Sequence, residues 1–178
     1  MQLKVHRTTP RAKLPSFAHE GDACFDMAVV IDGEHPPMSV ADGGFLELGA
    51  ERLADAGDAG DGGRLSAAIP PGETMVFHTG LRFETEKGYA MKVHVRSSTG
   101  IKRGLSIANG TGIIDTATYR GEVLVALRNL STEPSEVEDG DRVAQAEIVR
   151  IPDVEIVETD GLTDTERGEG GFGSTGKR

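Results

Sequence analysis

Turn-forming residues break this chain into short segments and so limit the folds that it can adopt. The 178 residues include 24 glycines and 8 prolines, and no tryptophan. Because glycine and proline interrupt regular elements and favour turns, this composition predicts many short strands rather than long helices. A typical domain has about 150 residues, so we expect a single all-β domain.

Several segments between these turns alternate apolar and polar residues. Between Tyr89 and Arg96, for example, Met91, Val93 and Val95 face one way while Lys92, His94 and Arg96 face the other, as in a half-buried strand. The same reasoning predicts strands over residues 2–8, 23–31, 74–84, 89–96, 105–108, 122–130, 142–150 and 154–157. Strands of this length and spacing are typical of a sandwich or a barrel-like jelly roll.

Residues 31–66 differ from the rest of the chain in composition. They contain eight glycines, eight acidic residues and two basic residues, and contribute −6 of the formal net charge of −10. We expect an acidic surface insertion, with a short helix over residues 45–54 and a solvated loop over residues 56–63. A surface for an unknown protein partner is the second interpretation of this segment.

The overall charge and hydropathy restrict the partners and the location of the chain. A net charge of −10 disfavours direct binding to nucleic acid or to an anionic membrane. Residues 1–18 lack the apolar run of a signal peptide, and no later stretch is long and apolar enough to cross a bilayer. We therefore expect a cytoplasmic protein.

The sequence offers no covalent nucleophile or zinc site. The five histidines do not pair at ligand spacings, and Cys24 has no cysteine or histidine near it in the sequence. No serine stands in a G-x-S-x-G element. Covalent catalysis therefore has no visible candidate in the sequence.

Polar residues suited to phosphate follow two of the predicted strands. Residues 96–100 (RSSTG) combine a cation with hydroxyls at a turn. Residues 109–112 predict a tight hairpin whose backbone faces a ligand edge. Asp115 follows two apolar residues and is either a general base or an ordinary turn former at the end of a strand.

The last segment, residues 167–178, is either a disordered tail or a lid. It contains five glycines, three cations and one phenylalanine, Phe172. Exposing a phenylalanine is unfavourable unless it meets a surface. As a lid, the segment would stack Phe172 on a base while Arg167 and two hydroxyls bind phosphates.

Taken together, five segments in this order resemble the trimeric deoxyuridine triphosphatases (dUTPases). They are residues 23–28 (ACFDMA), 96–100 (RSSTG), 109–122 (NGTGIIDTATYRGE), 140–145 (GDRVAQ) and 167–176 (RGEGGFGSTG). Each segment is weak or moderate alone, but the ordered set is highly specific. The resemblance implies a distorted jelly-roll subunit of the β-clip type over residues 1–166, a homotrimer with shared active sites, and a flexible C-terminal arm over residues 167–178 that closes another subunit's site.

The resemblance also implies a reaction. dUTP would be hydrolysed to dUMP and pyrophosphate by Mg²⁺-assisted attack of water on the α-phosphorus. This reaction limits uracil incorporation into DNA and supplies dUMP for thymidylate synthesis. Hydrolysis of this kind needs positioning, cations and one base, which agrees with the absence of a protein nucleophile.

The motifs assign a role to individual residues. Asp115 would hold the 3′-hydroxyl and orient the attacking water as general base. The backbone around Asn109 and Gly112 would read the uracil edge, and Tyr119 would pack under the deoxyribose. Mg²⁺ would be held chiefly by the triphosphate and would reach Asp26 through water.

The remaining assignments concern the phosphates and the arm. Phosphate oxygens would be bound by Arg96, Ser97, Ser98 and Gln145. The arm would close over the nucleotide through Arg167, Phe172, Gly173, Ser174 and Thr175.

The chain departs from the family pattern at one point. Three residues, 116–118, stand between Asp115 and Tyr119, where the family usually has two. A bulge that absorbs the extra residue would preserve the site; otherwise the rate or the sugar discrimination would suffer.

Two alternative functions remain at this point. A dCTP deaminase shares the fold, but this chain has Ala126 where the deaminase pattern has its catalytic glutamate. A dUTP-sensing regulatory protein would instead present residues 31–66 to a protein partner.

Overall fold

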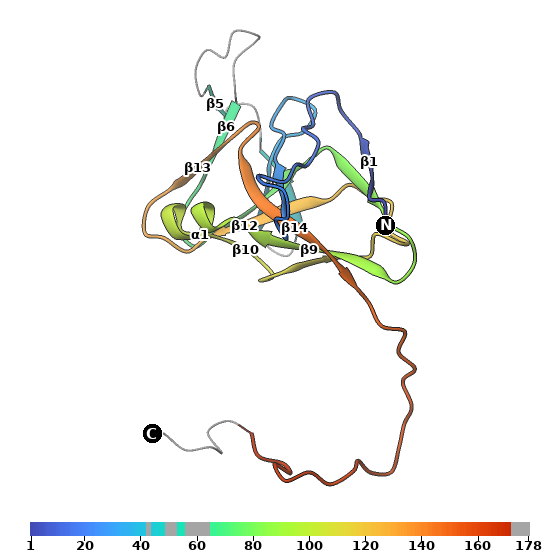
Figure 1. Ribbon diagram of the computed structural model, residues 1–178. Helices are drawn as coiled ribbons and strands as arrows, with labels where there is room; N and C mark the ends of the chain where they lie inside the picture. Colours follow the sequence, from blue (N-terminus) through green and yellow to red (C-terminus); the bar gives the residue numbers. More distant parts are fainter. Residues whose placement is uncertain (42–43, 49–52, 56–64, 172–178) are drawn as a thin grey trace.

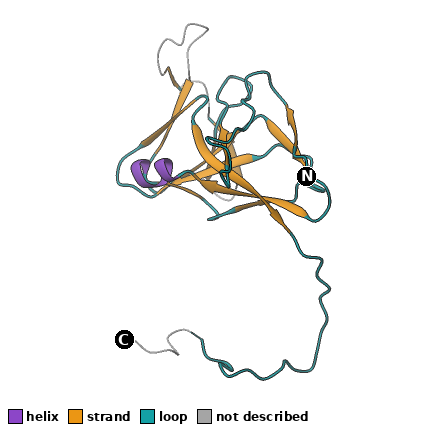
Figure 2. Ribbon diagram, viewed as in Figure 1, coloured by secondary structure: helices purple, strands orange, loops and turns teal. Residues whose placement is uncertain are grey.

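Short antiparallel strands form most of the ordered framework, and one short helix interrupts them (Figures 1 and 2). The computed structural model describes residues 1–41, 44–48, 53–55 and 65–171. Within these ranges the strands are β1 (Lys4–Arg7), β2 (Phe25–Ala28), β3 (Met38–Ala41), β4 (Gly44–Glu47), β5 (Ala54–Asp55), β6 (Leu65–Ile69), β7 (Thr74–His78), β8 (Leu81–Glu84), β9 (Tyr89–Val95), β10 (Leu105–Ile107), β11 (Gly112–Ile114), β12 (Leu124–Asn129), β13 (Ser135–Glu138) and β14 (Arg142–Arg150). The helix, α1, spans Ser97–Arg103. The all-β prediction is confirmed.

The strands pair in four groups, and most neighbours are far apart in the sequence. The two larger sheets have the orders β10-β12-β7-β3-β4 and β11-β9-β14-β2, and the smaller groups are β13-β6-β5 and β1-β8. All the described strand pairs are antiparallel. In the second large sheet β14 lies between β9 and β2, so three distant segments of the sequence become neighbours.

The core follows the alternation seen in the sequence. In β12, Val125 and Leu127 are buried while Leu124 and Arg128 face outward. Other large side chains that are almost fully buried are Met27, Ile31, Ile69, Met75, Phe77, Leu81, Met91 and Leu105. Burying a side chain of this size contributes about 1.5–3 kcal/mol, so this core can hold the strands without a disulfide.

The base of the acidic insertion is a strand pair and not a helix. The helix expected over residues 45–54 is wrong in its described part, because β4 pairs with β3 through Met38↔Glu47 to Ala41↔Gly44. Asp42-Gly43 stands between the two strands, a dipeptide strongly favoured in two-residue hairpins. Pairing with β3, and through it with β7, outweighs the local preference for a helix. The loop expected over residues 56–63 lies outside the described residues.

Two further predictions differ from the structure. Residues 97–103 form α1, where only a strand end and a turn were expected. The helix ends at Gly104, whose φ of 65° lies in the left-handed region and whose N–H donates to the Gly100 carbonyl. The strand expected over residues 154–157 is absent, because residues 154–171 extend away from the sheets and pair with no described strand (Figure 1).

Several other strand predictions are confirmed. β14 has the predicted bounds, and β1, β2, β9, β10 and β12 lie within the predicted ranges. The single strand expected over residues 74–84 is instead two strands, β7 and β8, which belong to different sheets and are separated at Gly80, where φ is 66°. No helix among the described residues is long and apolar enough to cross a membrane.

Candidate active site

One pocket brings together three of the five sequence segments. It has a volume of about 530 Å³, and its lining consists of Ala18, Asp22, Ala23, Cys24, Asp26, Arg96, Ser97, Ser98 and Gln145. We call it the Arg96 pocket. The sheet explains why these residues meet: Gln145 on β14 stands opposite Asp26 on β2 and His94 on β9 in the strand register.

Asp26 lies at the base of this pocket and is only 9% exposed. Its Oδ1 is 2.7 Å from Arg96 Nε, and its Oδ2 accepts a hydrogen bond of 3.1 Å from Arg142 Nη1. A buried carboxylate is costly unless it is paired, and here two guanidinium groups provide the charge and the donors. The acid in the middle of an apolar strand is thus explained by its pairing with two arginines.

Several residues that line the Arg96 pocket carry hydrogen-bond donors. Ser97 and Ser98 begin α1 and are exposed, while Thr99 beside them is buried. The Arg96 side chain is three-quarters buried, and its Nη1 donates to the Arg142 carbonyl. The Gln145 amide donates to the Val95 carbonyl at 3.4 Å. A fixed guanidinium, two free hydroxyls and an amide suit the oxygens of a phosphate chain.

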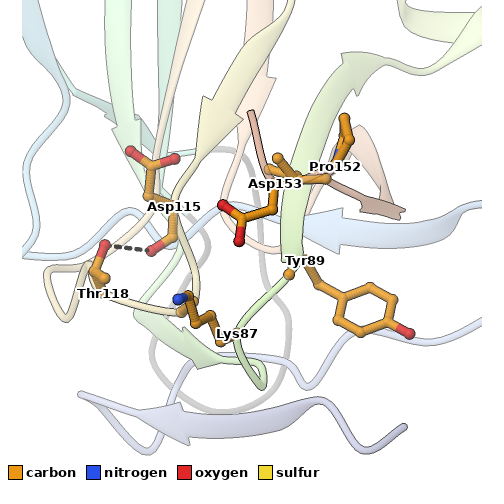
Figure 3. Close-up of a pocket in the computed structure, with 9 residues that line it drawn as sticks. Lys87, Tyr89, Asp115, Thr118, Pro152 and Asp153 are labelled. Carbon is orange, nitrogen blue, oxygen red and sulfur yellow. Dashed lines mark hydrogen bonds between the residues drawn. The ribbon is translucent and has the colours of Figure 1, made fainter. Parts of the chain in front are cut away.

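Asp115 lies in a different pocket, of about 450 Å³ (Figure 3). We call it the Asp115 pocket; its lining consists of Lys87, Gly88, Tyr89, Asp115, Ala117, Thr118, Ile151, Pro152 and Asp153. The two pockets share no lining residue. Within the part of the chain that the structure describes, the candidate base is therefore separated from the candidate phosphate ligands.

The residues expected to read the base flank a tight turn. The Gly110 N–H donates to the Ile107 carbonyl at 2.9 Å, and Asn109 is exposed. The hairpin expectation needs a correction, because β10 before the turn pairs with β12, whereas β11 after it pairs with β9. The turn thus carries the chain from one sheet to the other. Gly112 lies against β9, where an added Cβ would come within 3.2 Å of Val93 Cβ.

The position of the Tyr119 ring depends on a hydrogen bond from its hydroxyl and on the absence of a side chain at Gly121. Its ring is 47% exposed, and its hydroxyl donates to the Glu122 carbonyl at 3.1 Å. A Cβ on Gly121 would lie 2.2 Å from the Tyr119 hydroxyl oxygen, so only glycine leaves room for the ring in this position.

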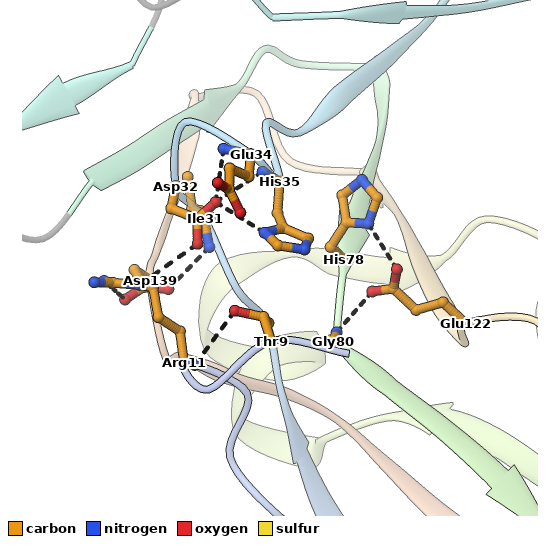
Figure 4. Close-up of polar contacts among 10 residues, drawn as sticks. All are labelled: Thr9, Arg11, Ile31, Asp32, Glu34, His35, His78, Gly80, Glu122 and Asp139. Carbon is orange, nitrogen blue, oxygen red and sulfur yellow. Dashed lines mark hydrogen bonds and ion pairs between the residues drawn. The ribbon is translucent and has the colours of Figure 1, made fainter. Parts of the chain in front are cut away.

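A histidine–glutamate pair beside this segment was not predicted from the sequence. Glu122 accepts hydrogen bonds from the Gly80 N–H at 2.6 Å and from His78 Nδ1 at 3.1 Å (Figure 4). The bond to Glu122 raises the pKa of His78 more than burial lowers it. Burial raises the pKa of Glu122, but the bonds from His78 and Gly80 lower it further, so the net shift is downward. The pair fixes the start of β12 against the loop between β7 and β8.

A second histidine, His35 in the acidic insertion, contacts the ring of His78. The rings of His35 and His78 lie edge to face, with centroids 5.4 Å apart. His35 Nδ1 is 2.9 Å from Asp32 Oδ1. Burial raises the pKa of Asp32, but the hydrogen bonds from His35 and from two backbone N–H groups lower it below its usual range.

The described part of the C-terminal arm, residues 167–171, contributes no lining residue to either pocket. Arg167 is exposed, and its Nε donates to the Gly170 carbonyl at 2.9 Å. Phe172, Gly173, Ser174 and Thr175 lie outside the described residues.

Magnesium would find few direct ligands in the protein. Among the described residues no three histidine, cysteine, aspartate or glutamate side chains come together to hold a metal ion. Both oxygens of Asp26 already face arginines. Since Mg²⁺ keeps several waters and binds chiefly to substrate phosphates, the donor set fits a metal carried by a triphosphate and contacted through water.

Comparison with known proteins connects this geometry to a family. The dUTPase family model matches residues 64–176. A deoxyuridine 5′-triphosphate nucleotidohydrolase of Wolinella succinogenes is 32% identical over 177 residues, which cover 99% of this chain and 95% of that protein. The corresponding protein of Nautilia profundicola is 48% identical over 109 residues, covering 61% of this chain and 76% of that protein.

Solved structures give the same architecture. A Staphylococcus bacteriophage 80alpha dUTPase solved with dUpNHpp has a TM-score of 0.73 at 22% identity, covering 99% of each chain. A phage phi11 dUTPase, described with a structural Mg(II) ion, has a TM-score of 0.66 at 19% identity and covers 92% of this chain. These likenesses confirm the jelly-roll fold. With a family model matched over more than half of the chain and a full-length relative above 30% identity, the chain belongs to the dUTPase family.

Proposed function

We propose that this chain hydrolyses dUTP to dUMP and pyrophosphate at active sites divided between the subunits of a homotrimer. Family membership supports the reaction, which makes the chain a dUTP diphosphatase. The observation that carries the division of the site is the separation of the Arg96 pocket from the Asp115 pocket. The dCTP deaminase and the dUTP-sensing regulator are not favoured by these matches.

In this proposal the Arg96 pocket binds the triphosphate. Arg96, Ser97, Ser98 and Gln145 donate hydrogen bonds to phosphate oxygens, as the resemblance implies. The paired Asp26 keeps the Arg96 guanidinium in place before substrate arrives. A protein with a net charge of −10 needs such a local cluster of cations to attract a polyanion.

Asp115 supplies the base. Water held by its carboxylate attacks the α-phosphorus, the proton passes to the carboxylate, and pyrophosphate leaves. Asn109 and the backbone at Gly112 bind the uracil edge. Tyr119 packs under the deoxyribose and leaves no room for a 2′-hydroxyl.

Magnesium, which the family uses in general, neutralises charge on the triphosphate when it is bound. Asp26 is the residue that would contact it through water. Because Asp26 also holds two arginines, its replacement should weaken phosphate binding even where magnesium is absent.

The arm completes the site from another subunit. Residues 154–171 extend away from their own β domain, which supports a role at a neighbouring copy (Figure 1). Arg167, Gly173, Ser174 and Thr175 would close over the phosphates while Phe172 covers the base. The division of the chain into a β domain over residues 1–166 and an arm over residues 167–178 remains a prediction.

Two finer expectations accompany this proposal. A cytoplasmic location fits the activity and stays a prediction. Contact between residues 31–66 and a further protein also stays a prediction; Phe45 and Leu46, exposed on β4, are the apolar side chains that such a partner would cover.

The proposed activity is tested by incubating the purified protein with Mg²⁺ and, separately, dUTP, dCTP, dTTP or UTP. The products are then separated by ion exchange. We expect dUMP and pyrophosphate from dUTP alone. Ammonia and dUTP formed from dCTP would support a deaminase, and tight dUTP binding without turnover would support a regulator.

A further inference from the structure

The loop between Asp115 and Tyr119 contains one residue more than the family pattern, and the structure places it in a closed turn. β11 ends at Ile114, so the extra residue is not absorbed by a bulge within a strand. The Asp115 carbonyl accepts hydrogen bonds from the N–H groups of Thr118 and Tyr119, at 2.8 and 2.7 Å. The longer loop therefore keeps Asp115 and Tyr119 bonded to each other through the backbone.

The inner side of this turn is anchored to the end of β8. Thr116 is fully buried and Thr85 is 5% exposed, and their hydroxyls are 2.7 Å apart. The Thr85 N–H also donates to the Thr116 carbonyl at 3.2 Å. Thr85 directly follows β8, which pairs along its whole length with β1. Thr116 is thus joined to a paired strand by its side chain and its backbone.

The outer side of the turn is held by one guanidinium group. Arg120 Nη1 donates to the carbonyls of Thr116 and Tyr119, each at 3.0 Å, and Nη2 donates to the carbonyl of Ala117 at 3.1 Å. Nη2 is also 3.4 Å from Glu84 Oε2. The outer and inner anchors therefore end on two adjacent residues, Glu84 and Thr85.

The Asp115 carboxylate depends on these anchors. Asp115 is exposed, and no described residue donates a hydrogen bond to its carboxylate. Its position is consequently set by its backbone, and the backbone is set by the turn that follows. A displacement of about 1 Å at a reacting group can lower a rate by about 10²-fold.

We propose that Thr116 and Arg120 are positioning residues of the reaction: together they fix the lengthened turn so that Asp115 and Tyr119 keep the spacing that water activation and sugar discrimination need. This inference rests on the proposed function. Arg120 acts through the geometry of its planar fork, since three carbonyl oxygens accept from one guanidinium, and a lysine ammonium cannot reproduce that arrangement.

The first test replaces Arg120 by glutamine and by lysine. We expect both variants to lower kcat for dUTP by about 10- to 100-fold and to lower the ratio of kcat/KM for dUTP over UTP. Amide hydrogen exchange at Thr118 and Tyr119 should become faster in both variants. Arg82→Gln is the matched control, because Arg82 is an exposed arginine on β8 whose side chain makes no described hydrogen bond or ion pair, and it should retain the kcat of the wild type.

The second test uses the buried hydroxyl pair. Thr116→Val leaves the Thr85 hydroxyl buried without its partner, which should lower the melting temperature. The double variant Thr85→Val/Thr116→Val removes both hydroxyls and should regain most of that loss. Because two methyl groups cannot approach as closely as two hydrogen-bonded hydroxyls, kcat should stay low in the double variant.

Three results would overturn the inference. One is an Arg120→Gln protein with the kcat and the dUTP preference of the wild type. A second is full rescue of kcat by Arg120→Lys, which would show that only the charge matters. The third is recovery of kcat together with the melting temperature in the double valine variant, which would show a purely structural role. A wild-type protein that does not hydrolyse dUTP would instead refute the proposed function, and the exchange of the Thr118 and Tyr119 amides would still report on the anchors.

Discussion

At the scale of single residues, ionised side chains are placed by their partners rather than by their motif alone. Asp26 could be recognised in the sequence as an acid in an apolar strand, but its two arginines come from β14 and from the end of β9. Asp115 has the opposite environment, since it is exposed and held only through its backbone. The two acids therefore suit different roles, one in fixing cations and one in accepting a proton.

Replacing Asp115 by asparagine tests the proposed base. We expect the turnover of dUTP to fall about 10²-fold or more, because the amide cannot take the proton from water. Binding of dUpNHpp, measured by calorimetry, and the elution volume on size exclusion should stay unchanged. Near-normal turnover would remove Asp115 from this role.

Replacing Gly121 by alanine tests the position of Tyr119. The new Cβ would collide with the Tyr119 ring, so the ring must move and its hydrogen bond to the Glu122 carbonyl is lost. We expect a smaller preference for dUTP over UTP, measured as the ratio of kcat/KM. Gly33→Ala, where an added Cβ meets nothing within 4 Å, is the matched control. An unchanged preference in Gly121→Ala would separate Tyr119 from sugar discrimination.

The His78–Glu122 pair predicts a pH dependence of stability. A raised pKa of His78 stabilises the fold fully below about pH 6.5, and this contribution is lost as the pH rises through the raised value. A lowered pKa of Glu122 stabilises the fold above about pH 4.5 and is lost as the pH falls through the lowered value. Glu122→Gln should therefore lower the melting temperature more at pH 5.5 than at pH 9.

Calorimetry at these two pH values checks this expectation. Glu86→Gln serves as the control, since Glu86 is exposed and has no described contact. An equal loss of melting temperature at pH 5.5 and pH 9 would show that the charge on His78 does not contribute.

At the scale of elements, the sequence contained signals for two of the features that were missed. Lys102 and Arg103 followed by Gly104 are typical of the last turn and the end of a helix, as α1 shows. Asp42-Gly43 between alternating residues favours the β3–β4 pairing over a helix. The third difference, at residues 154–157, has another cause: an apolar segment becomes a strand only if a neighbouring strand is present to pair with it.

The arm is the element whose removal best separates fold from activity. Deleting residues 167–178 should abolish most dUTP hydrolysis, because the lid residues are lost. The melting temperature should stay the same, since the β domain ends with β14 at Arg150. A variant with the same twelve residues in scrambled order controls for chain length. Full activity of the truncated protein would contradict the lid.

At the scale of the whole molecule, the proposed site combines residues from more than one chain. The Arg96 pocket and the Asp115 pocket share no lining residue among the described residues, so in this proposal a second copy brings the base to the phosphate ligands. Light scattering should accordingly give a mass about three times the 18.8 kDa of one chain.

Mixed assemblies provide the sharper measurement. Asp115→Asn and Arg96→Gln chains should each be nearly inactive alone. When the two are co-expressed and purified together through different tags, only mixed trimers remain, and one of the three sites in each should combine an intact base with an intact phosphate pocket. Activity near a third of the wild type is therefore expected. Mixed assemblies as inactive as the single variants would place each site within one chain.

The sequence by itself determined the fold class, most strand positions and the family, because alternation of apolar residues and short ordered motifs are local properties of the chain. It also indicated Asp26 and Asp115 as acidic residues whose positions, in or directly after an apolar segment, require a structural or functional explanation. Only the tertiary structure decided the partners: the arginines around Asp26, the His78–Glu122 pair and the Thr85–Thr116 contact each join residues at least 31 positions apart. Such pairs follow from strand order and register, which composition and spacing do not encode.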